Sequence, residues 1–335
     1  MKTTLICFLL SATIAAAAPG DFHVTGRIAV GGEGGWDYLT VDSAARRLYI
    51  SHATKVVVVD MDTEKVVGEI PDTPGVHGIA LAPKLNRGFT SNGRSNNVTI
   101  FDLKTLKPLG QVKTGDNPDA IAYDEKSNRV VTFNGRSKDA TVFEAATGKV
   151  AATIPLGGKP EFPAADNKGK MWVNIEDTHE IAEIDIAKAA VTKRYVLEGC
   201  EDPTGLAMDF QHNRIFSACG NKVMAISDPA AGKVIAKLPI GDGSDGAAFD
   251  PGTGLAFSSN GEGTMTVLQL KGGKYEVAAT VPTERGARTM TVDPKTHKLY
   301  LPAAKYGPTP PASEGKKSAR PAMLPGSFVV LVVAQ

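Results

Sequence analysis

The chain has 335 residues, of which 42% are hydrophobic and 22% are charged, a composition typical of globular proteins. Its 37 basic and 36 acidic side chains give a formal net charge of +1. Proteins that bind nucleic acids normally carry a strongly basic face, so we expect no nucleic-acid partner. The length alone allows either two ordinary domains or one large array of repeats.

The N-terminus has the pattern of a secretory signal peptide. A basic start at Lys2 is followed by the apolar run 5–10 and by small residues up to Ala18. We therefore expect residues 1–18 to be a signal peptide, residues 19–335 to form a single domain, and the protein to be periplasmic or secreted. A membrane anchor is the alternative, but the apolar run is short for a span and no longer one follows it. We expect no membrane span after signal removal.

Seven copies of one pattern fill most of the remaining chain. Each contains runs of alternating apolar and polar residues, typical of half-buried strands, separated by polar turns. The copies begin 40 to 43 residues apart, at Trp36, Val76, Pro118, Pro160, Pro203, Ser244 and Ala287. This period, with four strands per copy, predicts an all-β fold, a seven-bladed β-propeller with four antiparallel strands per blade. We expect the blades near residues 36–75, 76–117, 118–159, 160–202, 203–243, 244–286 and 287–335.

The seventh copy offers only three strands. The alternating run 22–30 stands before the first copy and has no hairpin partner beside it. We expect this N-terminal strand to supply the outer strand of the last blade, which closes the ring and removes exposed sheet edges.

The repeat resembles that of the YVTN-type (YncE-like) family of exported seven-bladed propellers. The segments that carry the resemblance are Asn117-Pro118-Asp119-Ala120, Phe133-Asn134, Ala145-Ala146-Thr147-Gly148-Lys149-Val150 and Ile154-Pro155-Leu156-Gly157. The tetrapeptide Tyr-Val-Thr-Asn itself is absent, and Met171-Trp172-Val173-Asn174 comes closest to it. The resemblance covers about residues 22–335 and implies the fold. It implies no particular reaction, because members of this family are mostly of unassigned activity.

In a propeller the first strand of each blade lines the central channel, and its start meets the end of the second strand on one face, here called the mouth. The residues that enter the first strands, here called the ring residues, are Asp37, His77, Asp119, Glu161, Thr204, Asp245 and Arg288. The ends of the second strands and the turns after them add His52, Asn92, Arg94, Asn134, Arg136, Glu176, Asn260, Glu262 and Tyr306. We expect a polar mouth that binds a small anionic ligand, a cation or a protein segment.

Two interpretations of the acidic ring residues stay open. An Asp before a strand often accepts hydrogen bonds from its own turn. Acidic groups that converge on one axis instead raise one another's pKa or bind a cation. His77, Glu161 and Arg288 depart from the Asp that other copies carry, which favours a functional role for them.

Two further patterns suggest ligands. Arg94 and Arg136 follow Asn-Gly in adjacent copies, and because the turn does not require Arg, the pair is suited to a carboxylate, phosphate or sulfate. Ion pairs with the ring acids are the alternative. His52, His77 and Asp37, with Asp119 beside them, form a candidate site for a single divalent metal ion such as zinc, copper or iron. Hydrogen-bonded histidines that bind an anion are the alternative there.

Cys200 precedes the first strand of the fifth copy and Cys219 ends its second strand, so the repeat register brings them together. In an oxidising compartment this predicts a disulfide, and a reactive thiol is the alternative. The last copy carries a proline-rich insertion at 303–326 on the mouth face. We interpret it as a lid over the channel or as a mobile basic loop.

We expect an exported binding or scaffold propeller, monomeric, whose partner is a small-molecule ligand or a protein. The alternative is a metal-assisted or acid/base hydrolase or lyase in the same funnel, resembling propeller lactonases. In that case a metal ion or His77 would activate water or abstract a proton, and Arg94, Arg136 or Arg288 would stabilise negative charge. A third class, interaction through the blade rims, would leave the ring structural. No haem-attachment, dinucleotide or nucleophile-elbow motif occurs in the sequence, so no catalytic residue is assigned.

Overall fold

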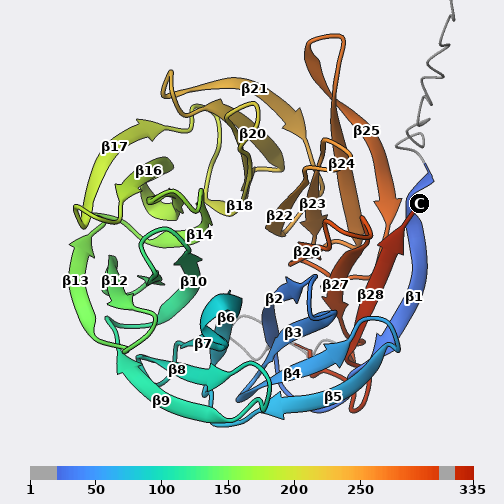
Figure 1. The fold of residues 1–335 in the computed structure, drawn as a ribbon. Coiled ribbons are helices and arrows are strands. Elements are labelled where there is room, and N and C mark those ends of the chain that lie inside the picture. The colour runs from blue at the N-terminus through green and yellow to red at the C-terminus, as the bar shows by residue number, and fades with distance from the viewer. Residues whose placement is uncertain (1–20, 309–320) are drawn as a thin grey trace, which may run out of the picture.

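The structure, a computed structural model, describes residues 21–308 and 321–335. Seven four-stranded antiparallel sheets stand around one axis, which confirms the predicted seven-bladed β-propeller (Figure 1). Two 3₁₀ turns, Pro83–Leu85 and Glu176–Thr178, interrupt this all-β architecture. The predicted signal peptide, residues 1–18, lies outside the described residues. Within those residues, no helix has the length and apolarity needed to cross a bilayer.

Six blades follow one another along the chain, and in each the strands run in sequence order from the channel outwards (Figure 1). Blade 1 contains β2 (Trp36–Asp42), β3 (Arg47–His52), β4 (Lys55–Asp60) and β5 (Lys65–Ile70). Blade 2 contains β6 (Val76–Ala82), β7 (Arg87–Asn92), β8 (Asn97–Asp102) and β9 (Pro108–Lys113). Blade 3 contains β10 (Pro118–Asp124), β11 (Arg129–Asn134), β12 (Asp139–Glu144) and β13 (Val150–Pro155). Blade 4 contains β14 (Pro160–Ala165), β15 (Lys170–Ile175), β16 (Glu180–Asp185) and β17 (Ala190–Val196). Blade 5 contains β18 (Pro203–Asp209), β19 (Arg214–Cys219), β20 (Val223–Asp228) and β21 (Lys233–Pro239). Blade 6 contains β22 (Ser244–Asp250), β23 (Leu255–Asn260), β24 (Thr264–Lys271) and β25 (Lys274–Pro282).

Blade 7 is built from both ends of the chain. Its strand order is β1-β28-β27-β26, with β26 at Thr291–Val292, β27 at Leu299–Ala303, β28 at Val329–Ala334 and β1 at His23–Ala29. The N-terminal strand β1 pairs antiparallel with β28, as the adjacent blue and red arrows of Figure 1 show. The predicted closure of the ring is therefore confirmed.

The hydrophobic core lies between neighbouring sheets. Between blades 3 and 4, for example, Val131 and Phe133 pack with Met171 and Val173, and all four side chains are fully buried. The middle strands supply most of this core because they are covered on both faces, and most residues of strands such as β3 and β4 are buried. The outer strands face solvent, where residues such as Val66 remain exposed.

A recurrent β-bulge aims the ring residues at the channel. In β2, two residues lie between Trp36 and Leu39, whereas only one residue lies between their pairing partners in β3, His52 and Ile50. The same shift follows Val76 in β6 and Pro118 in β10, and blades 4, 5 and 6 repeat it. A bulge leaves its extra residue out of the ladder and redirects its side chain. Each ring residue from blade 1 to blade 6 lies at such a bulge.

The predicted disulfide is confirmed in blade 5. Cys200 and Cys219 are joined, with their Cα atoms 5.3 Å apart, and both residues are buried. It ties the loop before β18 to the end of β19, as the repeat register requires.

The closing strand offers a direct test of how much stability the joined ends contribute. Ile28 of β1 is 1% exposed, whereas the side chain of its neighbour Arg27 is 56% exposed and pairs with Glu284. Ile28→Ala is expected to lower the free energy of unfolding by about 2–5 kcal/mol, because it leaves a cavity in the core. The control Arg27→Ala removes an exposed ion pair and is expected to cost less than about 1 kcal/mol. Urea denaturation measures the free energy of unfolding of both variants. Equal decreases would contradict the claim that packing of β1 against β28 stabilises the closed ring.

Candidate functional site

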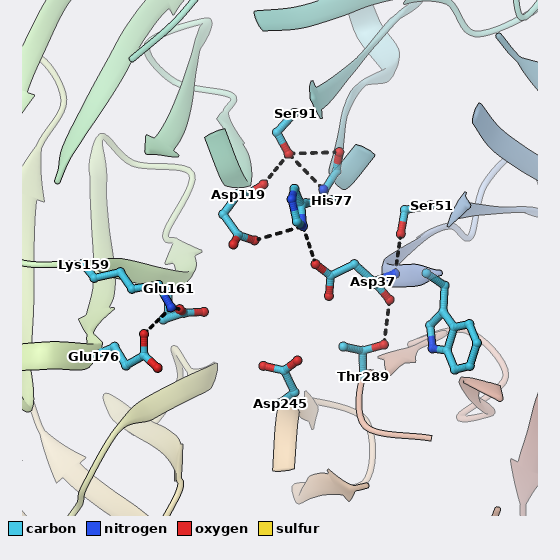
Figure 2. A network of polar contacts seen from close by, with 12 residues as sticks. Asp37, Ser51, His77, Ser91, Asp119, Lys159, Glu161, Glu176, Asp245 and Thr289 are labelled. Atoms are coloured by element: carbon cyan, nitrogen blue, oxygen red, sulfur yellow. Dashed lines mark hydrogen bonds and ion pairs between the residues drawn. The ribbon is translucent and has the colours of Figure 1, made fainter. Parts of the chain in front are cut away.

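Six ring residues place charged side chains around the mouth of the channel. They are Asp37 on β2, His77 on β6, Asp119 on β10, Glu161 on β14, Asp245 on β22 and Arg288 just before β26. Figure 2 shows the acidic side chains converging from their separate blades towards one centre. The seventh, Thr204, has a structural contact instead, since its hydroxyl donates to the backbone oxygen of Ser244 at 3.1 Å.

Asp37 makes contacts with both neighbouring blades. Its Oδ2 lies 2.6 Å from Nδ1 of His77, and its Oδ1 lies 3.7 Å from Nη2 of Arg288. Its backbone N–H donates to the hydroxyl of Ser51 at 2.8 Å, and its backbone oxygen accepts from the hydroxyl of Thr289 at 2.6 Å. The side chain and the backbone of one residue thus join blades 7, 1 and 2 (Figure 2).

Arg288 and Lys159 pair with two of the other ring acids, Asp245 and Glu161. Nε of Arg288 lies 2.7 Å from Oδ2 of Asp245. Nζ of Lys159 lies 2.7 Å from Oε1 of Glu161 and also pairs with Glu176. Lys159 was missed by the sequence reasoning because it precedes the aligned start of its blade by one residue.

The side chains of the ring aspartates do not bond to their own turns. In the part of the chain that the structure describes, the side chains of Asp37, Asp119 and Asp245 accept no hydrogen bond from their own turns. At the opposite ends of the inner strands, Asp42 and Asp209 do accept backbone N–H groups two and three residues ahead. Of the two interpretations left open by the sequence, the geometry favours the second.

Burial and mutual repulsion shift the pKa values of the ring. Burial, and then the charge of Asp37, raises the pKa of Asp119 to about 7 and also raises the pKa of Asp245. Burial and the charge of Asp119 raise the pKa of Glu161 to about 9. For His77, burial acts to lower the pKa, but the hydrogen bond to Asp37 and the charges of Asp119 and Asp37 raise it to about 9. At neutral pH, His77 is therefore a cation.

Two aromatic side chains meet below the ring. Tyr38 of blade 1 is 5% exposed, and its ring centroid lies 4.8 Å from that of Phe162 in blade 4. Burial, followed by the charges of Asp119 and Asp37, raises the pKa of Tyr38 well above its ordinary value. The sequence distinguishes these two positions, because four other copies carry small residues there: Gly78, Ala120, Gly205 and Gly246.

A pocket of about 970 Å³ opens beside the ring. Its polar wall includes Asp37, His77, Arg94 and Arg288, and its apolar wall includes Trp36, Tyr306 and Met323. The ring centroid of Trp36 lies 6.2 Å from that of Tyr306. Sequence reasoning missed Trp36 and Met323, although Trp36 opens its copy where the others carry Val, Pro, Ser or Ala. This size suits a small organic ligand.

The two equivalent arginines differ in place. Both are exposed, but Arg94 lines the pocket and Arg136, in the next blade, does not. Gly75, with φ +66°, lies under the stem of Arg94, and a Cβ there would stand 2.6 Å from Cγ of the arginine. Among the residues that the structure describes, Arg94 has no ion-pair partner, so the expected pairing with ring acids is not formed.

Three predicted mouth residues lie inside their blades. Asn92, Asn134 and Asn260 are fully buried. The amide of Asn92 donates to Asn97 and Thr99 at 2.9 Å each and accepts from Thr90, and the other two asparagines repeat this arrangement. Their hydrogen-bonding groups are used within the blade, so we do not count them among ligand contacts. Glu262 accepts the hydroxyl of Thr264 and does not line the pocket.

His52 does not join the candidate metal site expected from the sequence. Its ring is 1% exposed and stacks on Phe328 with centroids 4.5 Å apart. The glycine-rich segment 31–35, here called the glycine connector, covers it, since a Cβ on Gly32 would lie 2.7 Å from its Nε2. Burial lowers the pKa of His52. Within the described residues, the group that could hold a metal ion is instead Asp37, His77 and Asp119.

The insertion of blade 7 is described at its two ends. Tyr306 pairs with Met323, and backbone hydrogen bonds join Gly307 to Ala322 and Leu324 to Lys305. Pro321, Met323 and Pro325 line the pocket, so this segment forms one of its walls. Residues 309–320, in which most of the expected lid falls, lie outside the described residues.

Comparisons with known proteins support the fold. No protein-family model matches the chain, and no curated protein matches its sequence. Its structure is similar to that of Kuenenia stuttgartiensis hydrazine synthase, with a TM-score of 0.70 and 18% identity over 81% of this chain and 94% of that chain. The likeness shows the propeller fold. At this identity it says nothing about a shared reaction.

The pKa of His77 tests the electrostatics of the ring. Because this pKa is about 9 in the folded protein, against an ordinary 6.5, protonation of His77 stabilises the fold fully below about pH 6.5. That contribution is lost as the pH rises through about 9. In protein freed of metal by a chelator, NMR titration of the imidazole is expected to show a midpoint near 9. Asp37→Asn is expected to lower it by more than about one unit. A midpoint that stays unchanged in this variant would contradict the assigned cause.

Proposed function

We propose that the protein is an exported member of the YVTN-type propellers that binds a small organic anion at the channel mouth. The observation that carries the proposal is the pocket beside the ring, which combines Arg94, Arg288 and protonated His77 with an aromatic wall. A carboxylate would bind the cationic side, and an apolar body would pack on Trp36 and Tyr306.

The charges that line the pocket support an organic ligand that carries a negative charge. Three lining cations, Arg94, Arg288 and His77, face two lining acids, Glu33 and Asp37. Asp37 is already shared between His77 and Arg288. Within the described residues, the guanidinium of Arg94 forms no ion pair, so all of its N–H groups can donate to a ligand. A guanidinium binds a carboxylate through two parallel hydrogen bonds, which fixes orientation as well as affinity.

The disulfide supports export. The bond between Cys200 and Cys219 is typical of proteins that fold in an oxidising compartment. A periplasmic or secreted location follows as part of the proposal, and it agrees with the signal-like N-terminus of the sequence.

A matched pair of arginine variants tests anion binding. The probes are benzoate, hexanoate and glutarate, each compared with the corresponding neutral amide in a thermal-shift assay. At least one carboxylate is expected to raise the melting temperature while its amide does not, because a ligand specific for the folded state stabilises it. Arg94→Ala is expected to weaken this binding about tenfold or more, since it removes a charged hydrogen-bond donor.

Arg136→Ala is the control, because Arg136 occupies the equivalent turn of the next blade and does not line the pocket. It is expected to leave the affinity unchanged. Equal losses in the two variants, or equal shifts with carboxylates and amides, would contradict an anion site at this pocket.

A second candidate function is acid/base catalysis in the same pocket. The observation that favours it is the pair of His77 and Asp37, whose atoms Nδ1 and Oδ2 lie 2.6 Å apart beside Arg288. A His held by a carboxylate can transfer a proton, and an adjacent guanidinium can stabilise negative charge. If a bound carboxylate is turned over, NMR of the mixture will show product, and His77→Gln is expected to abolish it.

A further inference from the structure

Three side chains from three consecutive blades bring metal-ligating atoms together at the ring. Asp37, His77 and Asp119 each offer one such atom, and these atoms lie within 4.8 Å of one another. Nδ1 of His77 lies 2.6 Å from Oδ2 of Asp37 and 3.7 Å from Oδ1 of Asp119. Ligands that each stand about 2 Å from a shared zinc ion are separated by about 3–3.5 Å. The 3.7 Å distance is close to this value, and an ion would replace the hydrogen bond of 2.6 Å.

The backbone around these side chains is held in place by hydroxyl groups. Ser91 accepts the N–H of Gly78, the residue after His77, at 2.9 Å, and it donates to the backbone oxygen of Asp119. Ser51 accepts the N–H of Asp37. Figure 2 shows the Ser91 hydroxyl between the two strands that carry His77 and Asp119. The three side chains therefore start from fixed positions, as a binding site requires.

Asp119 supplies an independent indication that this group is a cation site. Its Oδ1 is completely buried and accepts no hydrogen bond within the described residues. The nearest positive atom, Nδ1 of His77, is 3.7 Å away and is hydrogen-bonded to Asp37. A buried carboxylate oxygen without a donor is costly, and a bound cation would satisfy it.

We propose that Asp37, His77 and Asp119 bind one divalent metal ion of the zinc or manganese class. The ion replaces the proton that Nδ1 of His77 shares with Asp37, so binding releases one proton to solvent. One imidazole nitrogen and two carboxylate oxygens suit such ions, whereas calcium and magnesium prefer oxygen ligands alone. Arg288 faces the other oxygen of Asp37, Oδ1, and so orients Oδ2 towards the site. Water completes the coordination shell.

Binding of the metal alone tests this site. The protein is freed of metal with a chelator and titrated with Zn²⁺ and Mn²⁺ by calorimetry near neutral pH, without any carboxylate probe. One ion is expected to bind per chain and to raise the melting temperature. Asp119→Asn and His77→Gln are each expected to weaken binding more than about tenfold, because each removes one ligand.

Glu262→Gln is the matched control, since Glu262 is a mouth acid that accepts the hydroxyl of Thr264 and lies outside both the three-ligand group and the pocket. This variant is expected to bind the ion as the wild type does. Melting curves in chelator show whether each variant is folded. No binding by the wild type, or undiminished binding by folded Asp119→Asn and His77→Gln, would overturn the proposal. Neither result bears on anion binding, which the arginine variants test separately.

Discussion

The carboxylate of Asp37 is the contact on which the mouth of this propeller depends. It lies where the ring of blades closes, with His77 of blade 2 on one oxygen and Arg288 of blade 7 on the other side. The backbone of the same residue is fixed by Ser51 within its blade and by Thr289 across the closing joint. Asp37 therefore both connects the blades where the ring closes and holds the charged side chains of His77 and Arg288 at the site. A change at Asp37 would act on both.

The charges of the ring are tolerated because the scaffold supplies partners for most of them. Burying an isolated charge is expensive, and pairing with a hydrogen-bonded cation repays much of that cost. Asp245 has Arg288 and Glu161 has Lys159, each at 2.7 Å. Asp119 has only the more distant His77, and its buried Oδ1 accepts no hydrogen bond within the described residues. The imbalance is concentrated beside the pocket, where a ligand or an ion can correct it.

The sequence predicts the fold well because the repeat is both regular and strictly patterned. Aligning the first strands of the copies is enough to predict that Asp37, His77 and Asp119 lie at the channel. The positions of the two cysteines in the same alignment predict the disulfide. Tertiary contacts decide the rest. Asn92 and its two equivalents bond to Thr side chains of their own blades, which the mouth-facing register does not reveal. His52 is covered by a glycine connector, and the pocket wall at Met323 comes from an insertion that no repeat position describes.

A crystal structure of the protein soaked with benzoate, hexanoate or glutarate is the most direct test of the proposed anion site. The carboxylate is expected to lie within about 3 Å of the guanidinium of Arg94, with its apolar part against Trp36 and Tyr306. A carboxylate bound only elsewhere on the molecule, with the pocket beside Arg94 and Arg288 holding solvent, would contradict this account.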